Sequence, residues 1–319
     1  MKSEIRKDYI QERYVIISPR RQARPTDVKE KKREAQIRRG NDICPFCPLH
    51  KEHKREGLYC VSQKGDAGVQ ACEDWKVKVI LNKFPAVTLD NEKAYGVQEV
   101  VIETPKHGVE LYELSEDHIA DIFQTYAAQT KEIAKNEKIE YVIIFKNQGG
   151  KAGASLEHAH SQIFATDFIP PHLIDKSQRV QRYKLEHGTC VYCDVIKKEQ
   201  EGPRLVYRDD FLIAFCPYAP AHNYELWIMP ILHLDNITLL SLEERMAWAH
   251  ASKKFLPKIH ELGLDYNYYF HQVVNDEDQH FYMKITPRGS IWAGVEIGSG
   301  VVINPVSPED AAQYYRGEA

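Results

Sequence analysis

The order of hydrophobic and polar positions predicts a strand, a helix and a second strand in the first half of the chain. Residues 98–106 form a strand-like apolar run that ends at His107, and residues 140–145 form another. Between them, Ser115 is suited to begin a helix, because its hydroxyl can accept a backbone N–H of the first turn. The helix carries apolar residues at helical spacing, which we assign to the core: Ile119, Ile122, Phe123 and Tyr126.

The same order of elements recurs in the second half, which indicates an internal duplication. A strand-like run, 224–232, ends at His233, and Ser241 begins a capping box with Glu244. The next helix carries an apolar stripe and ends at a glycine suited to a C-cap: Phe255, Leu256, Ile259, Leu262 and Gly263. A strand at 265–270 follows, so the chain is expected to fold as two similar modules in tandem.

The chain contains seven cysteines, and its N-terminus shows no apolar export signal, which favours metal binding over a disulfide framework. Four of them form two pairs with the spacing that lets both thiolates face one tetrahedral zinc ion: Cys44, Cys47, Cys190 and Cys193. A redox role for either pair is disfavoured, because the flanking sequences resemble loops. The remaining cysteines are interpreted as structural or incidental: Cys60, Cys72 and Cys216.

Each cysteine pair can recruit histidines from its own half of the duplication. The two predicted metal sites are Cys44, Cys47, His107 and His158 in the first half, and Cys190, Cys193, His233 and His280 in the second. His222 and His271 are rival ligands for the second site. Four nitrogen and sulfur ligands are typical of a closed structural zinc site, so one or two structural zinc ions are expected.

The segment 158–162, His-Ala-His-Ser-Gln, places two imidazoles one residue apart and an amide after them. In an extended segment, residues two apart face the same side, so both histidines and the glutamine would share one face. One histidine could then bind metal while the other attacks phosphorus. The preceding loop, 147–155, contains glycines that let backbone N–H groups approach an anion. The second half has Tyr282 where the first has His160, so only the first half is expected to catalyse.

Composition narrows the class of protein. The 319 residues are 43% hydrophobic, which is enough for large cores, and the formal net charge of −4 offers no polycationic surface for nucleic acid. The basic run 29–39 contains acidic residues too and is interpreted as a solvated loop or a short exposed helix. No apolar run approaches the ~18 residues that span a bilayer. We therefore expect no membrane association and a cytoplasmic location.

These motifs resemble those of the galactose-1-phosphate uridylyltransferase family, the nucleotidyl-transferring branch of the histidine-triad superfamily, nearly from end to end. Residues 13–25 resemble the family's opening strand and phosphate-contacting arginines, 81–85 its nucleoside-binding loop, and 293–300 its hexose-recognition loop. Ala159 departs from the family, because the uridylyltransferases usually have proline there, whereas relatives acting on ADP-glucose also lack it. The resemblance implies catalytic residues His160, Gln162 and Ser155, and substrate-binding residues Arg21, Arg24, Asn82, Asn147, Gly153 and Glu296.

The duplication and the resemblance together predict an α+β fold of two tandem histidine-triad-like modules, each a mostly antiparallel sheet with a packed helix. The predicted division is an N-terminal catalytic module, 1–176, and a C-terminal degenerate module, 177–319, joined near the polar segment 175–184. The resemblance also implies a homodimer with active sites near the subunit interface.

The activity that the resemblance implies is transfer of UMP from UDP-glucose to a hexose 1-phosphate such as galactose 1-phosphate. The reaction would pass through a covalent uridylyl-His160 in a ping-pong sequence, with a nucleoside diphosphate sugar and a sugar 1-phosphate as partners. One alternative keeps the fold but uses ADP-glucose or a dinucleoside polyphosphate, in adenylyl transfer or phosphorolysis. Another is a noncatalytic zinc-dependent protein that binds nucleic acid or another protein, for which His160→Ala would leave function intact.

Overall fold

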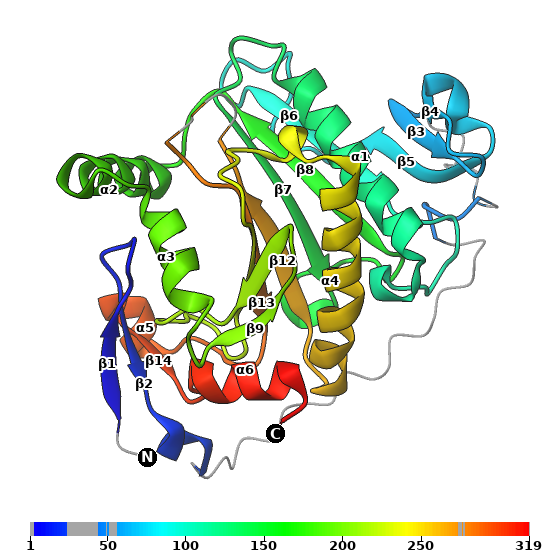
Figure 1. Ribbon diagram of the computed structural model, residues 1–319. Helices are drawn as coiled ribbons and strands as arrows, with labels where there is room; N and C mark the ends of the chain where they lie inside the picture. The colour runs from blue at the N-terminus through cyan, green and yellow to red at the C-terminus, as the bar shows by residue number, and fades with distance from the viewer. Residues whose placement is uncertain are drawn as a thin grey trace.

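The computed structural model describes residues 3–23, 44–48, 50, 56–273, 276 and 278–318 (Figure 1). The strands are β1 (Glu4–Lys7), β2 (Tyr14–Ile17), β3 (Tyr59–Ser62), β4 (Ala67–Gly68), β5 (Trp75–Leu81), β6 (Gly96–Ile102), β7 (Tyr141–Gln148), β8 (His160–Thr166), β9 (Leu205–Arg208), β10 (Leu212–Phe215), β11 (Leu226–Pro230), β12 (Tyr266–His271), β13 (Tyr282–Pro287) and β14 (Val302–Asn304). The α-helices are α1 (Glu116–Ile133), α2 (Pro171–His187), α3 (Val191–Glu199), α4 (Leu242–Glu261), α5 (Gly294–Ser299) and α6 (Pro308–Arg316). Short 3-10 helices are η1 (Pro19–Ala23), η3 (Val69–Cys72), η4 (Leu111–Glu113), η5 (Gly150–Ala152) and η6 (Ile237–Leu239).

One antiparallel sheet runs through both halves of the chain, in the order β4-β3-β5-β6-β8-β7-β12-β13-β11-β10-β9. The halves meet where β7 pairs with β12, with Phe145 opposite Tyr269 and Gln148 opposite Tyr266. A smaller sheet, β1-β2-β14, lies beside the second half (Figure 1). The strand order on either side of the β7–β12 pair is the same, so the predicted α+β fold of two similar modules is confirmed.

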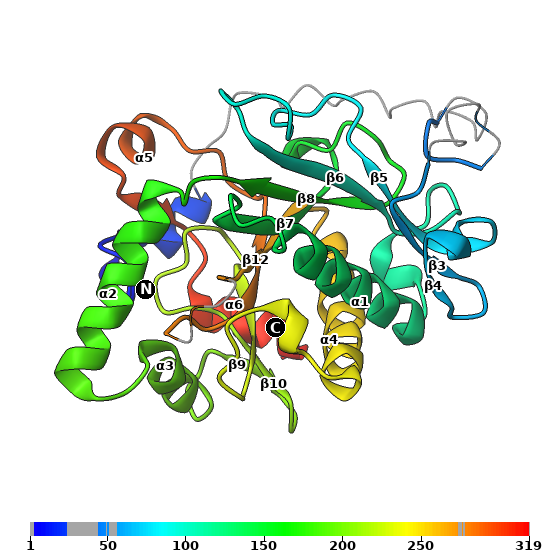
Figure 2. The same cartoon turned by 90° about the horizontal axis from the view of Figure 1, so that it is seen from above.

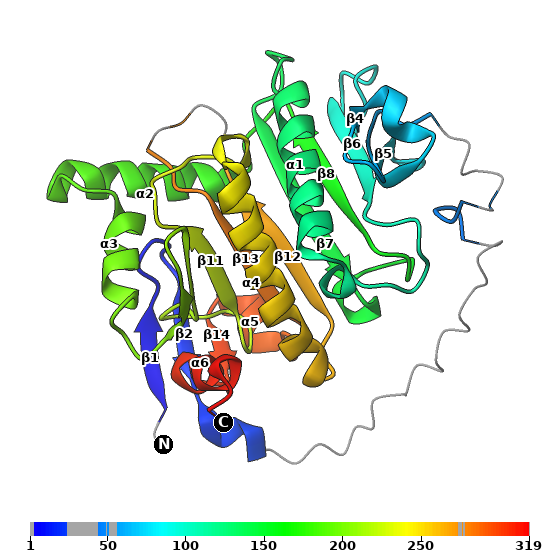
Figure 3. The same cartoon turned by 45° about the vertical axis from the view of Figure 1, so that its right-hand side comes forward.

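Helices α1 and α4 lie side by side on one face of this sheet (Figure 3). Their apolar stripes share a core with alternate strand residues such as Leu212 and Ile228. The intervening strand residues, Ile213 and Trp227, point to the opposite face, where α2 and α3 contribute to a separate core. Figure 2 shows α2 and α3 gathered beside the second half, away from α1. The second module is therefore covered on both faces.

Both helix starts predicted from the sequence are confirmed, and the segment predicted to join the modules is helical. Ser115 accepts a hydrogen bond from the His118 backbone, and the capping box of Ser241 is present. The segment 175–184, expected to join the modules as a polar connection, is part of α2. Its charged residues belong to a helix that exposes much of its surface, and the division expected at 176/177 falls inside that helix.

Two of the cysteines left without a partner by the sequence are joined. Cys60 on β3 and Cys72 on η3 form a disulfide, so of the two predicted alternatives, structural or incidental, the structural one holds for this pair. Their sequence separation of 12 closes a short hairpin, and such a pairing cannot be recognised from spacing alone. Cys216 is a free, buried cysteine.

Among the described residues, no helix is both long and apolar enough to cross a membrane.

Several polar side chains are buried inside the first module and where it meets the second. Lys146 on β7 is 2% exposed and donates to Glu103 at 2.7 Å, with the ammonium also 3.3 Å from the carbonyl of His160. The hydroxyl of Tyr126 on α1 donates to Ser161 at 2.6 Å and lies 2.9 Å from that of Tyr268. These bonds connect α1, β7, β8 and β12 at the centre of the sheet.

Lys146→Ala should lower the free energy of unfolding by about 3–5 kcal/mol, because it leaves the Glu103 carboxylate buried without its partner. The matched control is Lys135→Ala, which removes an exposed ion pair with Glu132 and should cost less than about 1 kcal/mol. Urea unfolding followed by circular dichroism measures both. Equal losses in the two variants would contradict a structural role for the buried pair.

Candidate active site

His160 is the first residue of β8 and is 8% exposed. Its Nδ1 lies 2.8 Å from the carbonyl oxygen of His158, and because a carbonyl can only accept, Nδ1 must carry the proton. The lone pair of the neutral ring is therefore on Nε2. Burial lowers the pKa of His160, and the nearby Lys146 ammonium lowers it further, against the opposing effect of the His158 carbonyl. The site thus favours a neutral, nucleophilic imidazole.

His158 points instead into a cluster of sulfur and nitrogen atoms. The ligand atoms of Cys44, Cys47, His107 and His158 all lie within 4.8 Å of one another. Nε2 of His158 is 2.7 Å from the carbonyl of Thr104, so it donates there, and Nδ1 faces Cys44 and Cys47 at 3.7 and 3.5 Å. Anchoring one ring nitrogen on a carbonyl while the other faces the ligands is typical of metal-bound histidine.

The chemistry of this cluster fits a zinc ion. Burial, together with the adjacent Cys44, raises the pKa of Cys47 to about 12, so two thiolates would be costly here without a cation. Burial also lowers the pKa of His158 to about 4, which keeps the ring neutral and available as a ligand. Two sulfur and two imidazole ligands in a buried setting are typical of structural zinc.

Gln162 is held by two neighbouring amides. Its side-chain oxygen accepts from Gln98 at 2.9 Å and from Asn82 at 3.3 Å. An amide whose oxygen is occupied in this way has its N–H groups left to donate. The carbonyl oxygen of the Asn147 side chain likewise accepts from Asn267 at 2.8 Å. Both side chains can therefore offer N–H donors to an anion.

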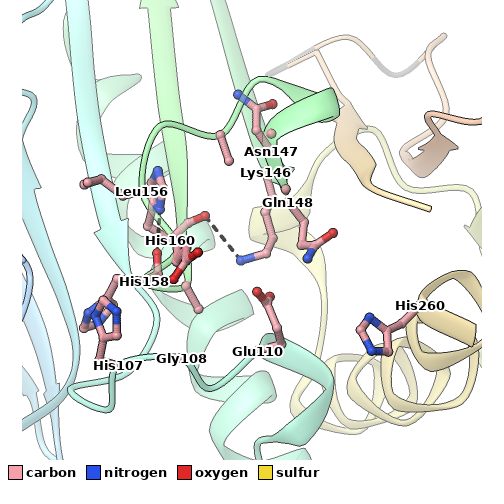
Figure 4. A pocket seen from close by; sticks show the side chains of 15 residues that line it. His107, Gly108, Glu110, Lys146, Asn147, Gln148, Leu156, His158, His160 and His260 are labelled. Carbon is pink, nitrogen blue, oxygen red and sulfur yellow. Dashed lines mark hydrogen bonds between the residues drawn. The ribbon is translucent and has the colours of Figure 1, made fainter. Parts of the chain in front are cut away.

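A cavity of about 470 Å³ opens beside His160 and Asn147. Its walls come from His107, His158 and His160 on one side and from the 147–150 loop, Glu110 and His260 elsewhere (Figure 4). Gly149 has φ +81°, and a side chain there would clash with Asp265, whose carboxylate accepts the backbone N–H of Lys151. The glycine therefore allows the loop to close over Asp265 at the edge of the cavity. Gly153, with φ +89°, ends η5 in this loop.

The second metal site is only partly assembled. Cys190, Cys193 and His233 have ligand atoms within 4.8 Å of one another, with Cys193 Sγ 3.3 Å from His233 Nδ1. The ring of His280 lies 5.0 Å from that of His233. The buried Nε2 of His280 has no hydrogen-bond partner among the described residues. The rivals lie elsewhere: His222 stacks on Trp292, and His271 lines a different cavity.

Several residues expected at the site do not line the cavity, among them Gln162, Asn82 and Gly153. Ser155 is exposed between Ala154 and Leu156, which do line the cavity. Glu296 on α5 is partly exposed and accepts the backbone N–H of Ala293, the N-cap of its own helix. The backbone N–H of Ala293 lowers the pKa of the Glu296 carboxyl, and the charge of Arg21 on η1 adds a smaller effect in the same direction. Arg24 lies outside the described residues.

Four polar side chains near His160 were not predicted from the sequence: Lys146, Glu103, Glu110 and His260. Lys146 continues the buried alternation of Val142 and Ile144 along β7, so a charged residue at a core position was the available signal. Glu103, Glu110 and His260 come from a loop, the start of η4 and a helix end, and only the tertiary fold brings them together.

Comparison with known proteins identifies the family to which this chain is related. The sequence model described as "Galactose-1-phosphate uridyl transferase, N-terminal domain" matches residues 1–170. ADP-glucose phosphorylase of Arabidopsis thaliana is 31% identical over 335 residues, covering 98% of this chain and 92% of the relative. Galactose-1-phosphate uridylyltransferase of Thermotoga maritima is 27% identical, covering 98% of each chain.

Solved structures agree with the sequence relatives. The crystal structure of the Arabidopsis thaliana ADP-glucose phosphorylase with bound ADP-glucose superimposes with a TM-score of 0.85 at 31% identity, covering 99% of each chain. A uridylyltransferase structure superimposes with a TM-score of 0.73 at 26% identity, covering 99% of this chain and 98% of the other. With the family model matching more than half of its length, this chain belongs to the galactose-1-phosphate uridylyltransferase family.

Proposed function

We propose that the protein transfers a nucleotidyl group from a nucleoside diphosphate sugar to a sugar 1-phosphate through a covalent intermediate on His160. The observation that carries this proposal is the hydrogen bond from Nδ1 of His160 to the His158 carbonyl, which leaves Nε2 as the nucleophile. Family membership supports the reaction class.

In the first half-reaction, the Nε2 lone pair forms a bond to the α-phosphorus of the donor. The bond from that phosphorus to the bridging oxygen breaks, and the sugar 1-phosphate leaves with the electron pair. In the second, a phosphate oxygen of the acceptor attacks the same phosphorus and displaces the imidazole. Neutral His160 is regenerated, and no other reactant is consumed.

The neighbouring amides would stabilise the charge that develops on the phosphoryl oxygens. Gln162 and Asn147 each have their side-chain oxygen occupied, so their N–H groups are available to donate. Ser155 and the backbone around Gly153 would have to approach with the loop when substrate binds. A zinc ion on the first cluster would anchor His158, and through its carbonyl the ring of His160, without contacting phosphate.

The uridylyl reaction, with UDP-glucose as donor and galactose 1-phosphate as acceptor, is our leading version. It is supported by the family match and by the Thermotoga maritima relative. Adenylyl transfer from ADP-glucose is the second candidate, because a relative named ADP-glucose phosphorylase is 31% identical over nearly the whole chain and Ala159 replaces the usual proline.

A homodimer would complete the site. Arg21 and Glu296 lie near each other and do not line the cavity, so a second copy would have to bring this pair to the sugar and phosphate groups. A guanidinium is suited to bind phosphate, and a carboxylate to bind sugar hydroxyls. We further propose that the enzyme acts in the cytoplasm, where both substrate classes would be available.

Incubation with UDP-glucose or ADP-glucose, without acceptor, should add the mass of one nucleoside monophosphate to the wild-type protein in intact-protein mass spectrometry. His160→Ala should give no adduct, whereas the control His250→Ala, which changes an exposed histidine on α4, should react normally. A UMP adduct supports the leading version and an AMP adduct alone the second. No adduct from either donor would overturn covalent transfer.

The first half-reaction should keep its rate as the pH falls through about 6.5, where an ordinary histidine becomes half protonated. Burial and Lys146 lower the pKa of His160, so the ring loses its nucleophilic lone pair only at lower pH. Single-turnover rates of adduct formation measured against pH test this. A one-proton loss of rate centred near the ordinary value would contradict the lowered pKa.

Cys47→Ser should reduce bound zinc by about one ion per chain, because it removes one of four tetrahedral ligands. It should also slow adduct formation, since His158 would lose its anchor. Cys193→Ser serves as the comparison: it should affect only the second site and leave adduct formation near the wild-type rate. Elemental analysis by mass spectrometry measures the metal, and unchanged zinc in Cys47→Ser would refute the first site.

A further inference from the structure

The catalytic face of the first module has a structural counterpart in the second. Gln162 lies opposite Val100 on β6 and Phe145 on β7, and Lys284 lies opposite Trp227 on β11 and Tyr269 on β12. Tyr282 precedes Lys284 by two residues, as His160 precedes Gln162.

The supporting hydrogen bonds match as well. Gln98 donates to Gln162 at 2.9 Å, and Lys284 donates to Glu225 at 2.8 Å. Gln98 precedes Val100 by two residues and Glu225 precedes Trp227 by two, so each partner occupies the same place in its module. The second module has thus kept the geometry of the site and exchanged its chemistry.

This counterpart face of the second module borders a cavity. A cavity of about 380 Å³ lies in front of Tyr282 and Lys284, covered by α2 and by the connection between β1 and β2. Aromatic side chains form much of its wall: Tyr141, Trp227, Tyr269, Phe270 and Tyr282. In Figure 1 the β1–β2 connection reaches up beneath α2, on the side of the second module away from α4. A cavity of this size with aromatic walls can hold a small ring-bearing molecule.

The cavity also holds a cation with no carboxylate partner among the described residues. Arg13 is paired with Asp8 at 2.8 Å, and Lys284 with Glu225. Lys176 on α2 is 3% exposed, lines the cavity and donates to the neutral hydroxyl of Tyr282. Burial lowers the pKa of Lys176 to about 7, because the charged form lacks a counter-charge there, and a bound anion would stabilise the ammonium form.

Two further groups in the wall could donate to an anion. Nε2 of His271 and Nε of Arg13 are buried, and neither has a hydrogen-bond partner among the described residues. Both residues line the cavity beside Lys176. Several donors around one hollow match the several oxygens of a phosphate group.

We propose that this cavity is a second, noncatalytic site for a phosphomonoester that carries a ring, either a sugar phosphate or a nucleoside monophosphate. The phosphate would meet Lys176 and His271, and the ring would pack against the aromatic wall. Tyr282 stands where the first module has its nucleophile, so the ligand would be bound and not transferred. The proposal does not depend on catalysis by His160.

Isothermal titration of the full chain with glucose 1-phosphate, AMP, UMP and inorganic phosphate tests this site. Lys176→Met keeps the length of the side chain and removes its charge, so at least one phosphomonoester should bind about tenfold or more weakly. The matched control Lys184→Met changes an exposed, ion-paired lysine on the same helix and should bind as wild type. Lys176→Met should still form the nucleotidyl adduct, whereas His160→Ala should retain the binding.

A second variant tests the same cavity without removing the buried amine of Lys176. Leu173→Trp would fill the cavity from α2 while keeping Lys176, and it should abolish the same binding event. A crystal of the wild type soaked with the best ligand should show it beside Lys176. Equal binding by wild type and both cavity variants would overturn the proposal, and so would ligand density at the first cavity alone. Binding of inorganic phosphate as tightly as the monoesters would refute the role of the aromatic wall.

Discussion

The hydrogen bond from His160 to the His158 carbonyl is the constraint on which the active site depends. It decides which nitrogen of His160 carries the proton, and therefore which nitrogen can attack. His158 is itself held, by the Thr104 carbonyl on one side and by the neighbouring cysteines on the other. The candidate metal ligands and the nucleophile that we propose are thereby linked through the backbone carbonyl of His158.

Duplication provided two such faces, and the structure shows how they diverged. The first keeps histidine and glutamine beside an open loop with glycines, which suits phosphoryl transfer. The second has Tyr282 and Lys284 at the matching positions and is covered by α2. In our proposals, the same strand register supports catalysis in one module and binding in the other. The continuous sheet places the two faces in one molecule.

Much of this arrangement could be predicted from the sequence, because periodicity and spacing are local signals. Ser115 and Ser241 begin their helices as predicted, and the four residues predicted to bind the first metal ion lie together. The pairing of Cys60 with Cys72 and the positions of Glu110 and His260 at the cavity depend on tertiary contacts that no local pattern encodes. The separation of Arg21 and Glu296 from the cavity has the same origin, since the resemblance gives residues and not their placement.

The most direct test of this account is to locate the bond in the trapped intermediate. Nuclear magnetic resonance of the ring of His160, after reaction with the nucleoside diphosphate sugar that forms the adduct, distinguishes substitution at the two nitrogens. The hydrogen bond to His158 requires phosphorus on Nε2, with the proton retained on Nδ1. Phosphorus on Nδ1, or on another residue, would contradict the mechanism.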